Sequence, residues 1–154
     1  MDKNSLMESA LKLKQVSVES AEEFMEKAED MTSKMNKIML SRTDLTDIIG
    51  EKNISMMQDN HANHARFLSS IFLHYNADVF IETILWVFRA YRSHGFTTNY
   101  WAAQLNNWIM IFKKELSPEC FKEIYPYYDW MQINIPLFVK LSDEKLDEVN
   151  TIHL

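Results

Sequence analysis

The stretch "AYRSHGFTTNYWAAQLNNW" (residues 90–108) decides the fold, because it joins two apolar helical runs. Gly95 stands where a left-handed residue commonly follows the end of a helix, and the threonines after it can cap the next helix. The pattern predicts one helix ending at residues 93–94 and another beginning near Asn99. Its aromatic side chains raise the question of whether this joint holds a cofactor or only forms the corner of a bundle.

Helical periodicity continues on both sides of this corner. Apolar residues recur every three or four positions, and few glycines or prolines interrupt them. The expected helices cover residues 54–75, 77–94, 99–116 and 118–141. Pro126 and Pro136 are expected to bend the last of these helices. The segment before them, residues 41–53, is expected to be a loop with one short turn.

The N-terminal segment is predicted to be amphipathic and helical. It is either one long helix or two in succession, separated at a capping Ser17 or Ser20. Its Met-rich stripe is expected to pack on the core or on a second subunit, and an adaptable binding surface is the alternative. The expected layout of the single domain, residues 1–154, is an N-terminal helix, a helical core and a short charged tail over residues 1–40, 54–141 and 142–154.

The composition favours an all-α fold. Two glycines and three prolines provide too few turns for a β-sandwich or a β-barrel. Since 47% of the residues are hydrophobic, the chain can bury one sizeable core. We therefore expect a helical bundle of about five to six helices.

Charge, cysteine content and hydropathy exclude several classes of partner. The net charge of −6 provides no basic surface for nucleic acid. The single cysteine, Cys120, excludes an internal disulfide, so a reducing, cytoplasmic location is expected. No apolar run approaches the roughly 20 residues of a membrane span, so none is expected.

Two histidines in "DNHANHARF" (residues 59–67) lie three positions apart. His61 and His64 therefore share one face of the expected helix, and two imidazoles at this spacing could chelate a transition metal. No Glu-x-x-His or His-Glu-x-x-His pattern supplies further ligands. Polar contacts at a partly buried face are the expected role of this pair, and a metal site at His61 and His64 is the alternative.

Bulky side chains of the central helices are expected to fill the core or to line a small, mainly apolar pocket beside Tyr91. These pocket or core residues are Phe67, Leu68, Ile71, Trp86, Phe88, Trp101 and Gln104. Gln104, between two tryptophans, is expected to be buried and hydrogen-bonded. Glu82 would indicate catalysis if it converged with His61 and a tyrosine on one cavity. We identify no catalytic motif and predict that the chain is not an enzyme.

The corner at Gly95 resembles the F–G corner of globin-type bacterial sensors, with Tyr100 and Trp101 as the aromatic pair that starts the next helix. Globin-coupled oxygen sensors carry their proximal histidine four residues before this glycine, where the present chain has Tyr91. The chain is more similar to the non-haem globin N-terminal domains of stressosome co-antagonist proteins. These share an Arg-Ala…Gly corner, here "FRAYRSHGF" (residues 88–96).

The closing segment "IYPYYDWMQINIPLFV" (residues 124–139) is comparable to the closing helix of those domains. The resemblance covers residues 54–141 and implies a globin-like bundle without haem, and a generic four-helix bundle is the alternative. If a haem were bound, Tyr91 or His94 would be the candidate on one side and His61 or His64 on the other.

The resemblance implies a non-enzymatic sensory or scaffold domain that acts in signalling through dimerisation and protein partners. The leading interpretation includes no cofactor, and a haem- or metal-binding sensor is the alternative. A homodimer is expected through residues 99–116 and 118–141, because globin-type sensors tend to dimerise through their last two helices. The alternative is a monomer in which the N-terminal helix covers the closing helix.

Overall fold

The computed structural model describes residues 3–152 of the chain, with side chains up to residue 144, and these residues form eight α-helices and no strand. The helices are α1 (Lys3–Ala10), α2 (Val18–Leu40), α3 (Leu45–Ile49), α4 (Ile54–Leu73), α5 (Ala77–Arg92), α6 (Thr98–Glu115), α7 (Pro118–Ile133) and α8 (Ile135–Ile152). The expected all-α class is therefore confirmed. The number of helices exceeds the expected five to six, because two expected helices are each divided and α3 is added.

The first division lies in the N-terminal segment. Ser17 is the N-cap of α2, and its hydroxyl accepts a hydrogen bond from the backbone N–H of Ser20 at 3.2 Å. The expectation of two helices with an interior serine cap is thus correct, and that of one long helix is wrong. A hydrogen bond joins the short helix α1 to α7, because Trp130 Nε1 donates to Ser9 Oγ at 2.8 Å.

The Met-rich stripe of α2 is buried within the chain. Phe24, Met31, Met35 and Met39 have no exposed surface, since α2 packs on α4, α6 and α7. The stripe therefore forms part of the core of this chain. The interpretation of the stripe as an exposed, adaptable binding surface is wrong.

The second division lies in the closing segment, where a single bent helix over residues 118–141 was expected. Pro126 is accommodated inside α7, but the helix ends at Ile133 and α8 begins at Ile135. Pro136 falls in the first turn of α8, where a missing N–H costs no intrahelical hydrogen bond. Residues 142–152, expected as a short charged helix or tail, continue α8, and residues 153–154 lie outside the described part.

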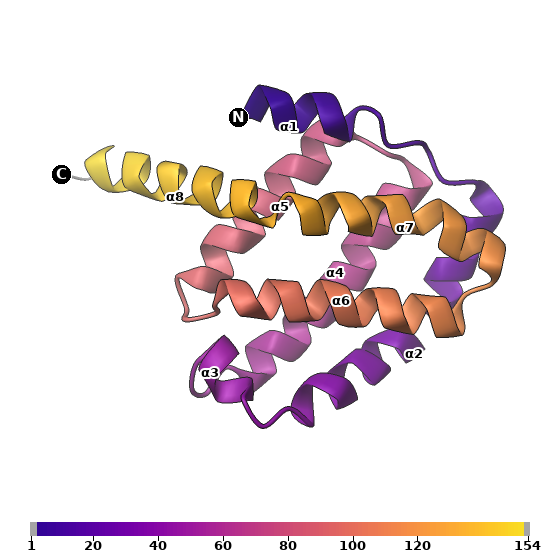
Figure 1. Ribbon diagram of the computed structural model, residues 1–154, viewed down its shortest axis with the longest axis horizontal. Coiled ribbons are helices and arrows are strands. Elements are labelled where there is room, and N and C mark those ends of the chain that lie inside the picture. The colour runs from indigo at the N-terminus through magenta and orange to yellow at the C-terminus, as the bar shows by residue number, and fades with distance from the viewer. Residues whose placement is uncertain (1–2, 153–154) are drawn as a thin grey trace.

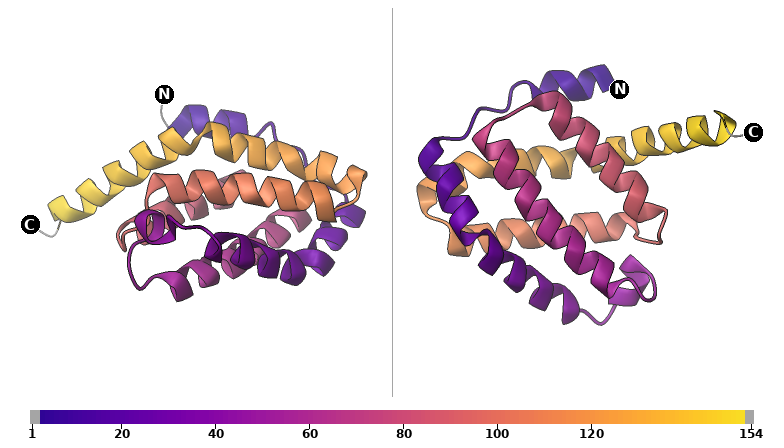
Figure 2. Two further views of the ribbon diagram at one scale, coloured as in Figure 1. Left: turned by 60° about the horizontal axis from the view of Figure 1, so that its bottom comes forward. Right: turned by 180° about the vertical axis from the view of Figure 1, so that it is seen from behind.

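The longer helices form two crossing layers. In Figure 1, α6, α7 and α8 lie in front of α4 and α5, and the view from behind in Figure 2 shows α4 and α5 in front, beside α2. The most extensive packing joins α2 to α4 and α5 to α8. The C-terminal part of α8 projects beyond the body of the bundle (Figure 1). Every helix within residues 3–152 is too short or too polar to cross a bilayer.

The corner between α5 and α6 has the predicted caps. Gly95 has a φ of +103°, and Thr97 is the N-cap of α6. The corner is docked on the end of α3, because the Thr97 N–H donates to the carbonyl of Ile48 at 2.8 Å. Gly50 also has a positive φ, and its Cα lies only 3.9 Å from the position that a Cβ would occupy on Gly95. The only two glycines of the chain therefore meet at this joint.

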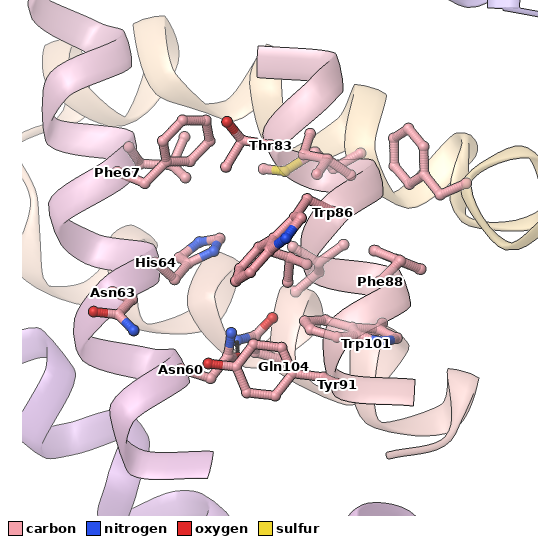
Figure 3. A pocket seen from close by; sticks show the side chains of 16 residues that line it. Asn60, Asn63, His64, Phe67, Thr83, Trp86, Phe88, Tyr91, Trp101 and Gln104 are labelled. Atoms are coloured by element: carbon pink, nitrogen blue, oxygen red, sulfur yellow. Dashed lines mark hydrogen bonds between the residues drawn. The ribbon is translucent and has the colours of Figure 1, made fainter. Parts of the chain in front are cut away.

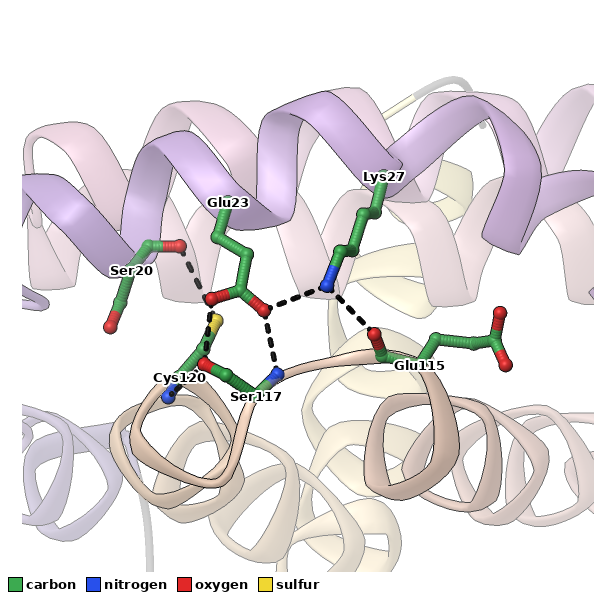
Figure 4. Close-up of polar contacts among 6 residues, drawn as sticks. All are labelled: Ser20, Glu23, Lys27, Glu115, Ser117 and Cys120. Carbon is green, nitrogen blue, oxygen red and sulfur yellow. Dashed lines mark hydrogen bonds and ion pairs between the residues drawn. The ribbon is translucent and has the colours of Figure 1, made fainter.

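Polar contacts fix the start of α7 against α2 (Figure 4). Ser117 is the N-cap of α7 and is followed by Pro118, as predicted. The carboxylate of Glu23 accepts hydrogen bonds from the Ser117 N–H at 2.7 Å and from its hydroxyl at 2.6 Å. Lys27 donates to Glu23 and to the carbonyl of Glu115, at the end of α6. One carboxylate and one ammonium of α2 thus join this helix to the end of α6 and to the start of α7.

Candidate functional site

A pocket of about 220 Å³ lies between α4 and α5, and its floor is formed by α6, α7 and α8 (Figure 3). Its lining residues are Asn60, Asn63, His64, Phe67, Leu68, Thr83, Ile84, Trp86, Val87, Phe88, Tyr91, Trp101, Gln104, Leu105, Met131 and Phe138. The pocket is thus mainly apolar and lies beside Tyr91, where the sequence left open either a filled core or a small, mainly apolar cavity. None of these lining side chains is an Asp, Glu, Lys or Arg.

The polar end of the pocket is built from a hydrogen-bonded group of side chains on α4 and α6. Asn60 Oδ1 accepts hydrogen bonds from Tyr100 Oη and from Gln104 Nε2, both at 2.7 Å. Gln104 Nε2 also lies 3.3 Å from Tyr100 Oη. These three residues are at least 97% buried, so the group is held in a low-dielectric interior, where such bonds are strong.

Gln104 has an unused hydrogen-bond acceptor in this group. The Nε2 of Gln104 donates a hydrogen bond to Asn60, but its Oε1 is buried and has no hydrogen-bond partner within the described residues. An unpartnered buried carbonyl is unfavourable by about 1–3 kcal/mol relative to one that is bound. Because Gln104 lines the pocket, a donor group on a bound molecule can satisfy this oxygen. The sequence predicted the burial of Gln104 but not its unpartnered oxygen.

His64 lies on α4, one turn after Asn60, and also lines the pocket. Its Nε2 lies 2.7 Å from Tyr128 Oη, and its ring stacks on Trp108 with centroids 5.3 Å apart. Burial, with a smaller repulsion from His61, lowers the pKa of His64 to about 3. Burial also raises the pKa of Tyr128 well above its ordinary value. At neutral pH this wall of the pocket is therefore uncharged.

His61 lies behind the pocket and does not line it. Its ring is buried, with Nδ1 2.6 Å from Asn36 Oδ1, and burial lowers its pKa to about 3. The two histidines share a face of α4, as predicted, yet each has its own polar partner. Their expected role in polar contacts therefore agrees with the geometry.

The candidate cofactor residues are only partly brought together. Tyr91 is buried and lines the pocket, together with His64. His94 is exposed at the end of α5 and lies outside the pocket, where its backbone carbonyl accepts a hydrogen bond from Asn53 Nδ2 at 2.8 Å. Glu82 does not converge with His61 on a cavity, because its carboxylate is partly exposed and pairs with Lys3.

Neither a metal nor a haem fits this arrangement well. Within the described residues, no group of three or more His, Cys, Asp or Glu side chains could hold a metal ion. His61 Nδ1 and His64 Nε2 have polar partners within the chain, and His61 Nε2, although unpartnered, has no third His, Cys, Asp or Glu ligand grouped with it in the described part. The pocket is smaller than the roughly 300–1,000 Å³ of typical small-molecule sites, so a haem would require the side chains around Tyr91 to move.

Most of the predicted pocket or core residues lie in the pocket wall. Phe67, Leu68, Phe88, Trp101 and Gln104 line it, whereas Ile71 is a buried core residue outside it.

Trp86 also lines the pocket, but it does not fill the core as expected, because 59% of its surface is exposed. Figure 3 shows its indole facing His64 across the pocket. The exposed indole of Trp86 therefore lies at the mouth of the pocket.

The sequence did not identify the polar partner that orients Gln104. Asn60 precedes His64 by four positions, so both lie on one helical face with Leu68, and this spacing was an available signal. The contributions of Met131 and Phe138 depend on how α7 and α8 cross the central helices. No local pattern in the sequence encodes that crossing.

Comparisons with known proteins identify no relative. No protein-family model matches the chain, and no curated protein or solved structure is significantly similar to it. The resemblance to globin-type sensors remains a prediction from the residues around Gly95, and the pocket between α4 and α5 is the feature from which a function can be argued.

Proposed function

We propose that the chain is a non-enzymatic sensory domain that binds a small uncharged molecule in the pocket between α4 and α5. The observation that carries the proposal is the unpartnered Oε1 of Gln104 at the polar end of an otherwise apolar pocket. A concave apolar site with a few fixed polar groups is the usual form of a small-molecule site.

Binding without chemistry is supported by the protonation states around the pocket. Acid–base catalysis needs a group whose pKa lies near the working pH. His64 has a pKa of about 3 and stays neutral, while the pKa of the neighbouring Tyr128 is raised. Among the described residues, the lining contains no carboxylate, ammonium or guanidinium group. The described part of the pocket therefore offers no charged side chain for acid–base catalysis or for electrostatic stabilisation of a transition state.

A bound molecule would contact the helices that lead away from the pocket. Phe88 of α5 packs on Phe138 of α8, with ring centroids 5.4 Å apart, and both residues line the pocket. Further along, Arg92 of α5 forms an ion pair with Asp143 of α8 at 2.7 Å. Occupancy of the pocket can therefore shift α8, whose projecting end would contact a signalling partner.

The proposal includes the homodimer and the globin-like, non-haem character expected from the sequence. The Met-rich stripe of α2 is buried within one chain and no longer argues for a dimer. Exposed apolar side chains remain on α6 and α7, namely Met110, Tyr125 and Ile133. These residues lie on the two helices through which globin-type sensors tend to dimerise. The single cysteine, Cys120, is a free buried thiol, which suits the proposed cytoplasmic location.

A fragment screen tests the binding function. Uncharged fragments are screened by ligand-observed NMR against the wild type, Val87→Phe and Val79→Phe. Val87 lines the pocket, so a phenyl group there should fill it and abolish binding, whereas Val79 is a half-exposed residue elsewhere on α5. Hits should bind the wild type and Val79→Phe but not Val87→Phe. Equal binding to all three proteins would disprove the pocket as the site.

An absorption spectrum of the purified protein tests the haem alternative. The proposal expects no Soret band. A stoichiometric Soret band that Tyr91→Phe removes would instead support a haem sensor with Tyr91 as an axial ligand.

A further inference from the structure

We propose that the ligand of this pocket is a small aromatic alcohol, whose hydroxyl group donates a hydrogen bond to Gln104 Oε1 and whose ring lies between the apolar walls. This inference rests on the proposed function, because it names the chemical class of the molecule that the sensory pocket receives. It follows from three properties of the site: its unsatisfied acceptor, its lack of charge, and its size.

The acceptor is fixed in place before any ligand arrives. Asn60 Oδ1 holds Gln104 Nε2 at 2.7 Å, and Asn60 is itself fixed by the hydroxyl of Tyr100. Gln104 is 1% exposed, so water in bulk does not reach it except through the pocket. A hydroxyl group suits this position because it donates to Oε1 and keeps lone pairs for a second polar neighbour at the same end.

The absence of charge excludes ionised ligands. A carboxylate or phosphate in the pocket would lose its hydration and find no cation among the described lining residues. His64 cannot supply that cation, because burial keeps its imidazole neutral at physiological pH. An ammonium group would likewise meet no carboxylate. The ligand is therefore uncharged.

The size and the walls indicate one aromatic ring with a short side chain. A cavity of roughly 150 Å³ accommodates benzene, so a volume near 220 Å³ corresponds to about nine non-hydrogen atoms. Flat aromatic side chains line much of the site, including Phe67, Trp86 and Tyr91. Rings pack on such faces in offset or edge-on arrangements, which favour an aromatic ligand over an aliphatic chain of equal size.

Three probes of one skeleton separate these properties in the wild-type protein. 2-Phenylethanol carries the hydroxyl group, ethylbenzene lacks it, and phenylacetate replaces it by a carboxylate. Each probe is titrated by NMR up to its solubility limit. 2-Phenylethanol should bind about tenfold more tightly than ethylbenzene, because only the alcohol satisfies Oε1. Phenylacetate should bind at least about tenfold more weakly than the alcohol, because its charge is desolvated without a partner.

A substitution identifies the acceptor, and a matched one controls for it. Gln104→Leu removes Oε1 at nearly constant volume and should abolish the preference for 2-phenylethanol over ethylbenzene. Gln58→Leu makes the same change on α4 outside the pocket lining and should keep the preference. If thermal denaturation shows that Gln104→Leu does not fold, the comparison of the three probes in the wild type decides alone.

The outcomes distinguish this inference from the proposed function. If ethylbenzene or phenylacetate binds as tightly as 2-phenylethanol, the alcohol class is wrong and the pocket remains a ligand site. If the preference survives Gln104→Leu, the anchor is wrong. If none of the probes binds and the fragment screen gives no pocket-dependent hit, both the inference and the proposed function fail.

Discussion

Glu23 and Glu123 each cap the helix on which the other lies. Glu23, on α2, accepts hydrogen bonds from the N–H and hydroxyl of Ser117, the N-cap of α7. Glu123, on α7, accepts hydrogen bonds at 2.8 Å from both the N–H and the hydroxyl of Ser17, the N-cap of α2. The two carboxylates therefore face the positive ends of two helix dipoles and join those helices reciprocally.

Removing either carboxylate should destabilise the fold. We expect Glu23→Ala and Glu123→Ala each to lower the free energy of unfolding by about 1–2 kcal/mol, because each change leaves helix-terminal donors without their acceptor. Glu26→Ala, an exposed position on α2, is the matched control and should change the stability by less than about 0.5 kcal/mol. Urea denaturation monitored by circular dichroism measures all three. Equal effects at Glu23 and Glu26 would contradict the reciprocal caps.

These caps also predict a dependence on pH in the acidic range. Burial opposes ionisation of Glu23 and Glu123, but hydrogen bonds from Ser117 and Lys27, and from Ser20 and Ser17, outweigh it and lower both pKa values below the ordinary 4.5. The stabilisation is therefore complete above about pH 4.5 and is lost as the pH falls through the lowered values. Denaturation curves between pH 5 and 3, compared with those of the Glu23→Gln/Glu123→Gln double variant, should show a shallower decline for the variant.

The buried His61 and the partly buried His64 predict a decline in stability that begins at higher pH. Burial lowers the pKa values of His61 and His64 from 6.5 to about 3, so the unfolded chain binds protons that the folded chain does not. Stability should therefore fall as the pH drops below about 6.5, by up to about 1.4 kcal/mol per pH unit for each histidine. Chemical denaturation at pH 7, 6 and 5 measures the slope.

His64→Gln should roughly halve this slope, whatever its effect at pH 7, because it removes one of the two titrating groups. The free energy of unfolding of the variant at pH 7 is the reference against which its slope is measured. An unchanged slope between pH 6 and 5 would show that His64 is protonated in the folded protein.

The glycine pair at the corner should be sensitive to an added methyl group. Both Gly50 and Gly95 have positive φ values, so alanine at either position introduces strain of about 1–2 kcal/mol. Gly50→Ala should cost more, because its Cβ would lie 3.0 Å from Asn53 Nδ2. That amide donates to the carbonyls of Ile49 and His94 and would have to leave them. Thermal denaturation of the two variants measures the order, and a larger loss for Gly95→Ala would contradict it.

Most of the helix boundaries that could be predicted from the sequence were indicated by chain breakers and capping residues. The sequence located the corner at Gly95 and the start of α7 at Ser117, and it offered Ser17 as one of two candidate caps for a division that it left open, because each depends on a local preference of a few residues. The break at Asn134 was missed because two prolines in one helical run do not show which of them ends a helix. The sequence left open whether the space beside Tyr91 is a filled core or a small pocket, and the polar end of the observed pocket depends on Asn60 of α4 meeting Gln104 of α6.

Helical periodicity did not predict the position of Trp86 correctly. A large aromatic residue on an apolar helix was expected in the core, yet its indole stands at the mouth, 59% exposed. We expect Trp86→Ala to change the free energy of unfolding by less than about 1 kcal/mol. Trp108→Ala is the matched comparison and should cost about 3–5 kcal/mol, since Trp108 is fully buried. A large loss for Trp86→Ala would indicate that another surface covers this side chain.

The assembly is tested through the exposed apolar side chains of α6 and α7. Met110 is 54% exposed and Ile133 is 68% exposed, although both are large and apolar. If these helices form the two-fold interface of the proposed homodimer, each side chain is buried against the partner, and a charge there is strongly unfavourable. Light scattering at micromolar concentration should give twice the chain mass of 18.3 kDa for the wild type.

Met110→Glu and Ile133→Glu should reduce that mass to that of a single chain. Leu11→Glu introduces the same charge at an equally exposed position after α1 and should leave the dimer intact. A wild-type mass of one chain would exclude the dimer, while a dimer that survives both α6 and α7 substitutions but not Leu11→Glu would move the interface to the N-terminal side of the bundle.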